Sequence, residues 1–343
     1  MPVLPRLADV ADAARVVTLP MRVRFRGVSE REALLLQGPA GWGEFAPFLE
    51  YDDAESARWL ASAIDAAWHA DEWPAPVRTE VPVNATVPAV PAEDVPGVLA
   101  RFDGCTTAKV KVAERGQALA DDVARVRAVR DALGPHGRIR VDANGGWDVP
   151  DAVRALTALA PAGLEYAEQP CSGVGDLRDL RLRLARAGVD VPIAADESVR
   201  KAEDPLRVVL AGAADVVVVK VAPLGGVRAA YEVATRLGAE HGVPVVVSSA
   251  LDTSVGIAAG VALAAALPEL PYACGLGTAS LLAADVTAHP LVPRGGVMQV
   301  APATVDDDLL AEHAAPPEHQ DWWRRRLERC YRLLEDGAAG STP

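Results

Sequence analysis

Lysine and arginine together number 34 in this 343-residue chain, and only four of them are lysines, at positions 109, 111, 201 and 220. A lysine can lose its proton and act as a base, whereas an arginine stays charged in a protein. Either residue serves for a solvated surface charge, so the retained lysines are the first place to look for proton transfer. Lys201 follows the acidic motif DES and is expected to be an ordinary loop charge.

Two of the lysines, Lys109 and Lys111, lie two residues apart in the β-branched run AKVKV. Side chains alternate along a strand, so both point to the same face. On a buried face each ammonium favours the neutral form of the other, which lowers at least one pKa toward that of a useful base. The alternative is a strand edge with two solvated lysines.

Three acids end the next three strand-like runs: Asp142 in VDAN, Glu168 in AEQP and Asp196 in ADES. Carboxylates that converge repel one another, and a hard divalent cation bound through oxygen relieves this, with Mg²⁺ fitting best. Singly, each acid would more often be a helix cap or a salt-bridge partner, but three in register predict a metal site. Polar neighbours expected to support it are Asn144, Gln169, Glu197 and Arg140, the last of which shares the inward face of Asp142.

Lys220 ends the run VVVVK on the following strand. After four apolar residues, a lysine there is buried unless it faces a polar mouth. We expect it to face Lys111 across the metal site.

The elements that must position these residues alternate between short β-branched runs and amphipathic stretches. The runs cover residues 81–87, 108–112, 139–144, 164–170, 191–198, 215–223, 243–250 and 272–278. Eight such runs with helical segments between them predict a closed, TIM-like α/β barrel, whose active site lies at the carboxyl ends of the strands. A doubly wound open sheet is the alternative, although no glycine-rich fingerprint follows the first strand. The helix at 121–133 is expected to bury its valines and turn its arginines to solvent.

The flanks differ from the barrel. Hairpin strands are predicted at 21–27 and 32–38, with a helix at 53–69, and the last part of the chain contains a short strand near 297–300 and a helix at 320–335. Together they predict a small α+β cap built from both chain ends. The expected divisions are 1–80 for the first part of the cap, 81–285 for the barrel and 286–343 for the segment that returns to the cap.

Composition limits the classes of partner. The net charge of −13 argues against a nucleic-acid surface, so small molecules are the expected partners. The N-terminus lacks the apolar core of a signal peptide, and no apolar stretch is long enough to span a membrane. Four widely separated cysteines form no CxxC pair, which favours a cytoplasmic protein. The oligomeric state stays open, with a monomer as the working expectation.

In this order, the motifs KxK, DAN, EQP, DES and KVAP resemble the enolase superfamily, in particular its muconate-lactonizing-enzyme-like subgroup. The resemblance covers nearly the whole chain, including GWGEFAPFLEY at 41–51. It implies a (β/α)7β barrel with an α+β capping domain. Within the subgroup, AKVKVAE, DANGGW, KVAPLGG and SSALDTSVGIAAG look most like o-succinylbenzoate synthases of the actinobacterial type, enzymes of menaquinone biosynthesis.

Carried over residue by residue, the resemblance implies that Asp142, Glu168 and Asp196 bind Mg²⁺, for which Mn²⁺ can substitute. Lys111 would remove the α-proton of a small-molecule carboxylate, and Lys220 would stabilise the resulting enediolate. Lys109 would tune Lys111. The implied lyase reaction is the syn dehydration of 2-succinyl-6-hydroxy-2,4-cyclohexadiene-1-carboxylate to o-succinylbenzoate.

N-acylamino-acid racemases of the same subgroup use the same lysine pair, so racemase or bifunctional activity is the competing expectation. Dipeptide epimerases carry an Asp-x-Asp on the last strand, where this chain has CGLGT. A neutral strand end with exposed backbone N–H groups suits an anionic or amide tail. Substrate selection is expected from the cap loop at about residues 22–29. The individual residues expected to contact substrate are Ser248, Ser249, Gly275, Gly277, Thr278 and Arg26.

Overall fold

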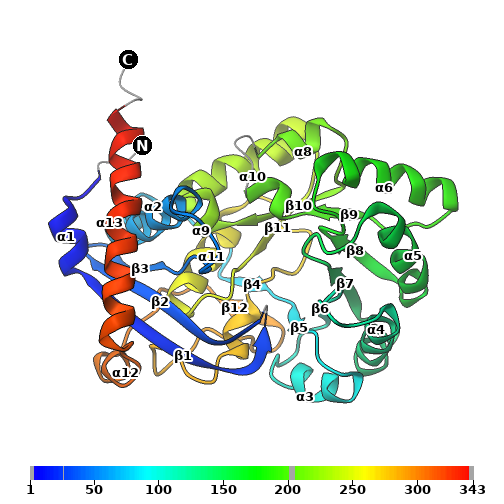
Figure 1. Cartoon of the computed structure of the whole chain (residues 1–343), viewed down its shortest axis with the longest axis horizontal. Coiled ribbons are helices and arrows are strands. Elements are labelled where there is room, and N and C mark those ends of the chain that lie inside the picture. The colour runs from blue at the N-terminus through cyan, green and yellow to red at the C-terminus, as the bar shows by residue number, and fades with distance from the viewer. Residues whose placement is uncertain (1–3, 26, 201–204, 340–343) are drawn as a thin grey trace.

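A parallel barrel and a cap made from both ends of the chain lie side by side in this computed structural model (Figure 1), which describes residues 4–25, 27–200 and 205–339. The predicted barrel with an α+β cap is confirmed. Arg26 and Lys201 fall outside the described residues.

The cap is built on an antiparallel sheet in the order β1-β2-β3, comprising β1 (Ala14–Phe25), β2 (Val28–Gly38) and β3 (Gly41–Phe45). The expected hairpin is present, but its strands are longer than predicted and the third strand was missed. Leu34, Leu35 and Leu36 of β2 are all fully buried, because the two faces of this central strand pack into different hydrophobic clusters. Because both faces of β2 are buried, its apolar residues follow one another without the alternation of a half-exposed strand.

Helices from both chain ends cover this sheet. They are α1 (Leu7–Asp12), α2 (Asp53–His69), α12 (Asp307–Glu312) and α13 (Pro317–Ala339). Helix α2 begins at the N-cap Asp52, whose side chain accepts from the Glu55 N–H. Helix α13 packs against α2 and β1, so the C-terminal segment completes the cap, as Figure 1 shows in red beside blue.

The barrel contains a seven-stranded sheet in the order β11-β10-β9-β8-β7-β6-β5, and every neighbouring pair is parallel. Its strands are β5 (Ala85–Val87), β6 (Thr107–Lys111), β7 (Arg138–Asp142), β8 (Leu164–Glu168), β9 (Ile193–Ala195), β10 (Val216–Lys220) and β11 (Val245–Ser248). The predicted eighth run contributes only two parallel bridges, Val83↔Cys274 and Ser248↔Gly275. These join both edges of the sheet, so the barrel closes and the open-sheet alternative is wrong.

The first predicted run divides into two strands with different partners. Only β5 joins the barrel, whereas β4 (Glu80–Pro82) pairs antiparallel with β12 (Val297–Gln299). The strand predicted near the C-terminus therefore pairs with the segment just before the first barrel strand and not with the cap sheet.

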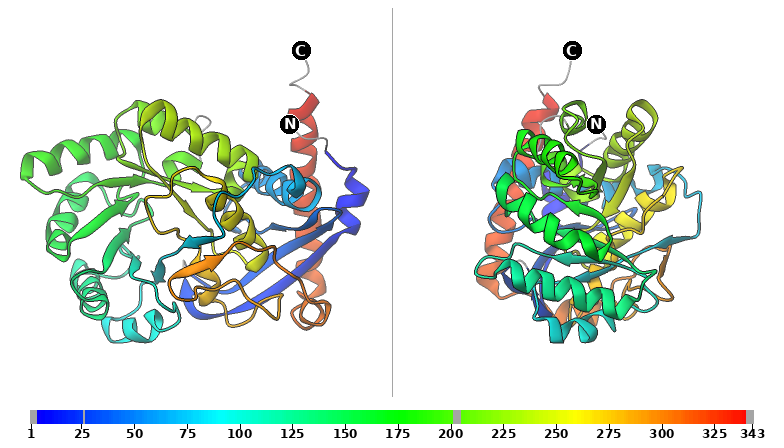
Figure 2. Two further views of the ribbon diagram at one scale, coloured as in Figure 1. Left: turned by 180° about the vertical axis from the view of Figure 1, so that it is seen from behind. Right: turned by 90° about the vertical axis from the view of Figure 1, so that its right-hand side faces the viewer.

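Helices pack around the outside of the barrel (Figure 2). They are α3 (Val95–Leu99), α4 (Leu119–Leu133), α5 (Val149–Leu159), α6 (Val174–Ala187), α7 (Glu197–Arg200), α8 (Arg207–Leu210), α9 (Val221–Leu224), α10 (Val227–His241) and α11 (Ser254–Ala266). Short 3₁₀ turns occur at η2 (Ala92–Asp94), η3 (Ala160–Ala162) and η4 (Gly277–Leu281), and η1 (Ala70–Glu72) extends the cap helix α2. One expectation for α4 is wrong, because Arg125 is buried. Its guanidinium pairs with Asp122 and donates to the Lys111 carbonyl at 2.8 Å, which satisfies its donors in the interior.

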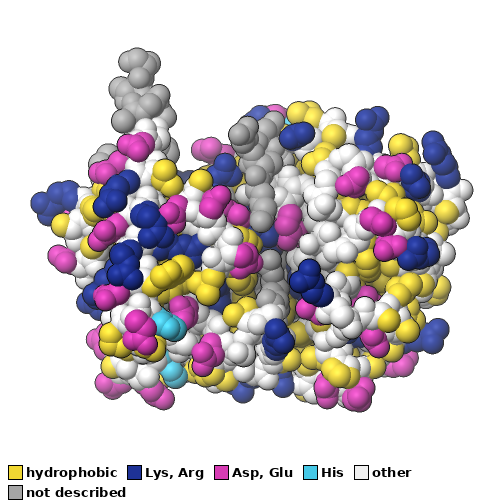
Figure 3. Space-filling view, in the orientation of Figure 1, with side chains coloured by type: hydrophobic (Ala, Val, Ile, Leu, Met, Phe, Trp, Pro, Cys, Tyr) yellow, Lys and Arg dark blue, Asp and Glu magenta, His cyan; other side chains and the backbone are white. Residues whose placement is uncertain are grey.

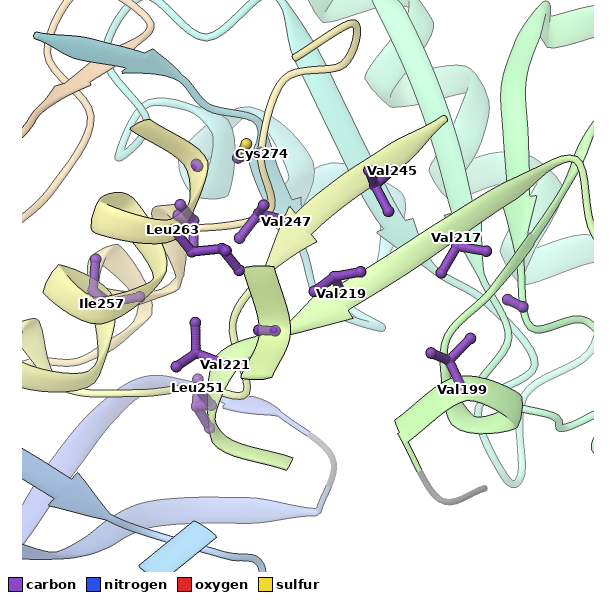
Figure 4. Close-up of a cluster of buried hydrophobic side chains, with 14 of the residues drawn as sticks. Val199, Val217, Val219, Val221, Val245, Val247, Leu251, Ile257, Leu263 and Cys274 are labelled. Carbon is purple, nitrogen blue, oxygen red and sulfur yellow. The ribbon is translucent and has the colours of Figure 1, made fainter. Parts of the chain in front are cut away.

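Alternation in β10 and β11 separates the barrel interior from the helical layer. Val217, Val219 and Val247 turn outward to the helical layer, where Figure 4 shows Val247 near Leu263 of α11 and Val217 beside Val199. Val216, Val218 and Val246 belong instead to an inner cluster with Tyr166 and Ala194. Lys220 continues this inward series, so its ammonium reaches the mouth of the barrel.

Acidic and basic side chains are interspersed on the face shown in Figure 3. All four cysteines are free thiols. Within the described ranges, no helix combines the length and the apolar character that crossing a membrane requires.

Close packing of β3 on α2 gives a test of the cap. A Cβ on Gly43 would lie 1.9 Å from the Ala63 carbonyl oxygen, so Gly43→Ala should lower the free energy of unfolding by about 1–3 kcal/mol. Gly238 is exposed on α10, and a Cβ added there would meet no atom within 4 Å. Gly238→Ala should therefore raise the free energy of unfolding by about 0.5–1 kcal/mol. Urea unfolding measures both, and equal effects would contradict the packing described.

Candidate active site

Six charged side chains meet inside the carboxyl end of the barrel. Register pairs Lys111 with Asp142 and Asp142 with Glu168 across β6, β7 and β8. Asp196 follows β9 and Lys220 ends β10. Lys109 points inward from a deeper position on β6, and all six side chains are buried.

Each ammonium is paired with a carboxylate. Lys109 Nζ lies 2.8 Å from Glu168 Oε1 and 3.1 Å from Asp142 Oδ2. Lys111 Nζ lies 2.6 Å from the same Asp142 Oδ2, and Lys220 Nζ lies 2.5 Å from Asp196 Oδ2. Buried charges of one sign are therefore offset by an equal number of the other.

The two lysines of β6 differ in their proton affinity. Burial lowers the pKa of Lys111, and the charge of Lys109 adds to this, although Asp142 opposes it. Burial also acts against the charged form of Lys109, but Glu168 and Asp142 outweigh it and raise the pKa of Lys109. Of this pair, Lys111 is the group better able to give up a proton.

The three acids also differ. Lys111 and Lys109 overcome the effect of burial and lower the pKa of Asp142, while Lys220 and Arg200 do the same for Asp196, lowering its pKa to about 2. Burial, together with the charges of Asp142 and Asp196, raises the pKa of Glu168 to about 7. The negative charges of both other acids therefore act on Glu168, as expected if the three carboxylates lie around one site.

This donor set fits a hard divalent cation, since it offers buried carboxylate oxygens from three adjacent strand ends. No three His, Cys, Asp or Glu side chains within residues 4–25, 27–200 and 205–339 are arranged as a ready metal cage. The three carboxylates are instead turned toward the lysines. The Nζ atoms of Lys109, Lys111 and Lys220 donate to Glu168, Asp142 and Asp196 and supply the positive charge beside them.

A layer of polar residues supports the charged groups. Asn144 Oδ1 accepts from Lys111 Nζ at 2.6 Å, and Asn144 Nδ2 donates to Glu197 Oε1 at 3.2 Å. Gln169 Oε1 accepts from the backbone N–H groups of Asp196 and Ser198. Asn144 and Gln169 have φ of 47° and 39°, a strained backbone that these contacts hold in place.

The expectation for Arg140 is wrong. Its guanidinium donates to Glu165 Oε2 at 2.5 Å, Asn84 Oδ1 at 3.0 Å and the Ala273 carbonyl at 2.7 Å, and none of its described hydrogen bonds goes to the three acids. Register places Arg140 beside Lys109 and Tyr166, one layer below Asp142. It shares the inward face, as predicted, but is too deep to contact the acids.

A pocket joins the lysines to the cap. Four of the predicted contact residues line it: Ser248, Ser249, Gly275 and Thr278. Gly277 does not, because the Asn84 carbonyl and the ring of Phe102 occupy the space beside its Cα. Phe25, which also lines the pocket, lies in the predicted cap loop at residues 22–29. The lining residues Phe48 and Thr86 were not predicted, although Phe48 lies in the quoted GWGEFAPFLEY motif.

Two details refine the pocket wall. A Cβ on Gly275 would lie 2.4 Å from Ser248 Oγ, so only glycine fits there. Its N–H donates to the Val247 carbonyl at 2.8 Å and is not available to a substrate tail, contrary to expectation. The hydroxyls of Ser249 and Thr278, 2.8 Å apart, are the polar groups at this end of the pocket.

Comparison with known families covers both parts of the chain. The enolase C-terminal domain-like family matches residues 97–304, and the enolase N-terminal domain-like family matches residues 16–67. The fold is similar to muconate lactonizing enzyme from Pseudomonas fluorescens complexed with muconolactone, with a TM-score of 0.73 and 23% identity, covering 88% of this chain and 98% of that one.

Curated relatives are more similar in sequence. The o-succinylbenzoate synthase of Mycobacterium tuberculosis is 57% identical over 97% of this chain and 98% of its own length. Those of Mycolicibacterium smegmatis and Thermobifida fusca are 57% and 59% identical, over 96% and 91% of this chain and 99% and 94% of their own lengths.

Arg138 and Arg140 share the partner Glu165 and allow a matched test of the deeper layer. Arg140→Met should lower the free energy of unfolding by about 3 kcal/mol, because it leaves buried acceptors without a donor. Arg138→Met should lower the free energy of unfolding by only about 0–1 kcal/mol, because the Arg138 side chain is 65% exposed. Denaturant unfolding of both variants measures this, and similar losses would count against the assignment of Arg140 to the core.

Proposed function

The chain belongs to the enolase superfamily, and we propose that it is a hydro-lyase with o-succinylbenzoate synthase activity, converting a hydroxycyclohexadiene carboxylate to o-succinylbenzoate by syn dehydration. The observation that carries this proposal is the pair Lys111 and Lys220, which line one pocket from β6 and β10 with three carboxylates on the strand ends between them. The 57–59% identity to curated synthases over most of the chain supports the same reaction.

Lys111 is the proposed base. It removes the proton from the carbon next to the substrate carboxylate, and the resulting ammonium returns that proton to the departing hydroxyl on the same face, so water leaves and no net proton is consumed. The lowered pKa of Lys111 supports this role. Asn144, which accepts from Lys111 Nζ, orients the amine.

Lys220 is proposed to remain charged and to stabilise the negative charge that develops on the substrate during proton removal. Its pairing with Asp196 at 2.5 Å supports a retained ammonium. Lys109, held by Glu168 and Asp142, adds positive charge beside Lys111 without exchanging its own proton.

Asp142, Glu168 and Asp196 are the proposed ligands of Mg²⁺. The bound ion would withdraw electron density from the substrate carboxylate and make the adjacent C–H more acidic. The raised proton affinity of Glu168 between the two other acids supports this assignment, because a divalent cation relieves the repulsion among the three.

The pocket wall supports a small carboxylate substrate with an aromatic product. Phe25 and Phe48 of the cap lie at the pocket, and the Phe25 ring centroid is 5.3 Å from Lys111 Nζ. The apolar Phe25 ring beside the amine limits the access of water to it. Four free thiols are consistent with work in the reducing cytoplasm, where the proposed reaction would serve menaquinone biosynthesis.

The lysine pair provides the first test of this mechanism. Lys111→Arg and Lys220→Arg should each reduce kcat for dehydration by roughly 10²–10⁴-fold, because arginine keeps the charge but cannot give up its proton and cannot reproduce a compact ammonium. Steady-state kinetics with Mg²⁺ measures the loss, and circular dichroism with thermal melting confirms the fold. Near-normal turnover of either variant would refute the two-lysine mechanism.

The choice of substrate distinguishes the proposed dehydration from the competing racemase activity. Purified protein is assayed with the cyclohexadiene carboxylate and with N-acylamino acids in deuterated water. Dehydration of the former at enzymatic rates is expected. Deuterium exchange into N-acylamino acids with no dehydration of the diene would overturn the proposed reaction.

The metal ligands are testable without activity. Saturating Mg²⁺ should raise the Tm of the wild type, since a ligand at a hundredfold excess over its Kd adds about 2.7 kcal/mol of stability. Glu168→Gln should lose most of this shift, whereas Asp307→Asn, which changes an exposed carboxylate on α12, should keep it. Differential scanning calorimetry gives the shifts, and an unchanged response in Glu168→Gln would remove this residue from the ligand set.

A further inference from the structure

Residues 249–253, the loop between β11 and α11, join the substrate pocket to the cap. Ser249, Ala250 and Leu251 line the pocket on one side of this loop. Leu251 has a φ of 66° and is 1% exposed, which is an unfavourable conformation for a branched side chain. Figure 4 shows it at the edge of the cluster that contains Val221. Such a loop keeps its shape only if its surroundings hold it.

Glu44 of β3 holds the loop from the cap side. Its Oε2 accepts from Thr253 N at 3.0 Å, Thr253 Oγ1 at 2.6 Å and Gly256 N at 3.0 Å. A Cβ on Gly256 would lie 2.7 Å from Asp252 Cβ and 2.9 Å from Glu44 Oε2, so the two acids converge on this glycine. One carboxylate of the cap therefore fixes the start of a barrel helix.

Arg31 of β2 binds the same loop by donating hydrogen bonds to the carbonyl groups of the loop. Its Nε donates to the Leu251 carbonyl at 3.1 Å, and its Nη2 donates to the Ala46 carbonyl. The guanidinium carbon lies 4.6 Å from the ring centroid of Phe48, which itself lines the substrate pocket. Arg31 thus links the loop, the cap and one wall of the pocket.

Glu44 and Asp252 are close enough to influence each other's protonation. They border a second, smaller cavity that Lys220 also lines. Burial and the charge of Asp252 raise the pKa of Glu44 to about 8, and burial raises the pKa of Asp252. The charged groups that oppose this are Arg31 from β2, which acts on both acids, and Lys220 from β10, which acts on Asp252.

We propose that Glu44 and Arg31 are positioning residues that set the 249–253 wall of the substrate pocket, and that this wall is held in place only while Glu44 and Asp252, which converge on Gly256, are not both ionised. The ligand used to test it, o-succinylbenzoate, rests on the proposed function. The hydrogen bonds and the strained loop do not.

The direction of the pH effect follows from the raised pKa of Glu44. A carboxyl group whose pKa is higher in the folded than in the unfolded protein stabilises the fold at low pH, and this contribution is lost as the pH rises through the folded value. Above about pH 8 two buried carboxylates face Arg31, and their repulsion acts directly on the Asp252 end of the loop. The pocket wall should loosen there.

The experiment compares Glu44→Gln and Glu44→Ala with the wild type. Glutamine resembles the protonated acid, so Glu44→Gln should bind o-succinylbenzoate with Mg²⁺ about as tightly near pH 9 as near pH 7. The wild type should lose about tenfold or more in affinity over the same interval, and Glu44→Ala should bind weakly at both. Isothermal titration calorimetry gives the affinities, and amide hydrogen exchange of residues 248–256 reports the loop without any ligand.

Asp285→Asn is the matched control. Asp285 is a buried carboxylate that accepts from Ser254 N and Ser254 Oγ at the same helix start, but it does not belong to β2 or β3, which carry Arg31 and Glu44. Its variant should lower the Tm and leave the affinity and its pH dependence unchanged.

Two results would overturn the proposal: a pH dependence of affinity that is the same in Glu44→Gln and the wild type, or an Asp285→Asn variant that matches Glu44→Ala in both affinity and exchange. Should the wild type neither bind nor form o-succinylbenzoate, the proposed function fails. The exchange rates of residues 248–256 in Glu44→Ala and Glu44→Gln still decide the positioning role, because slow exchange in Glu44→Ala would exclude it.

Discussion

Charge neutrality at the mouth of the barrel is the constraint on which the site depends. Three ammonium groups and three carboxylates are buried within a few ångströms of one another, and removing any one of the six leaves an excess of one sign of charge among them in a medium that screens poorly. The strands fix where these groups start, but the pairing fixes where they point. A lysine with four methylene groups has many rotamers, and the ion pairs select one of them.

The cap is part of this arrangement because it reaches the same charges from outside. Arg200 of α7 donates to Asp196 and Glu197, and its guanidinium also donates to Tyr51 Oη of the cap at 3.0 Å. Glu44 and Arg31 hold the β11–α11 loop a short way along the same junction. Docking of the cap therefore acts on an acid of the site and on a wall of the pocket.

Much of the site was predictable because parallel strands follow a simple rule. Alternation with a period of two placed Lys109 and Lys111 on one face, and their strand-end positions placed Asp142, Glu168 and Asp196 together. Depth was not predictable in the same way, and for this reason Arg140 was assigned to the acids although its partner Glu165 lies lower in the barrel. The pocket residue Phe48 was missed, and Phe25 was predicted only as part of a loop, because contacts between cap and barrel depend on docking, which no local pattern encodes. The cap strand β3 was missed for a different reason. It has only five residues, and the last three are all buried, so the sequence shows no alternation there.

Why Lys111 and not Lys109 should serve as the base cannot be decided from two identical residues on one strand. The difference lies in what surrounds each amine. Lys109 Nζ is within 3.1 Å of two carboxylates, which hold its proton, whereas Lys111 Nζ contacts one carboxylate and the neutral amide of Asn144. Burial then dominates at Lys111 and lowers its pKa. An amide in place of a second acid thus favours proton loss from one lysine of the pair, and the strained backbone of Asn144 maintains that contact.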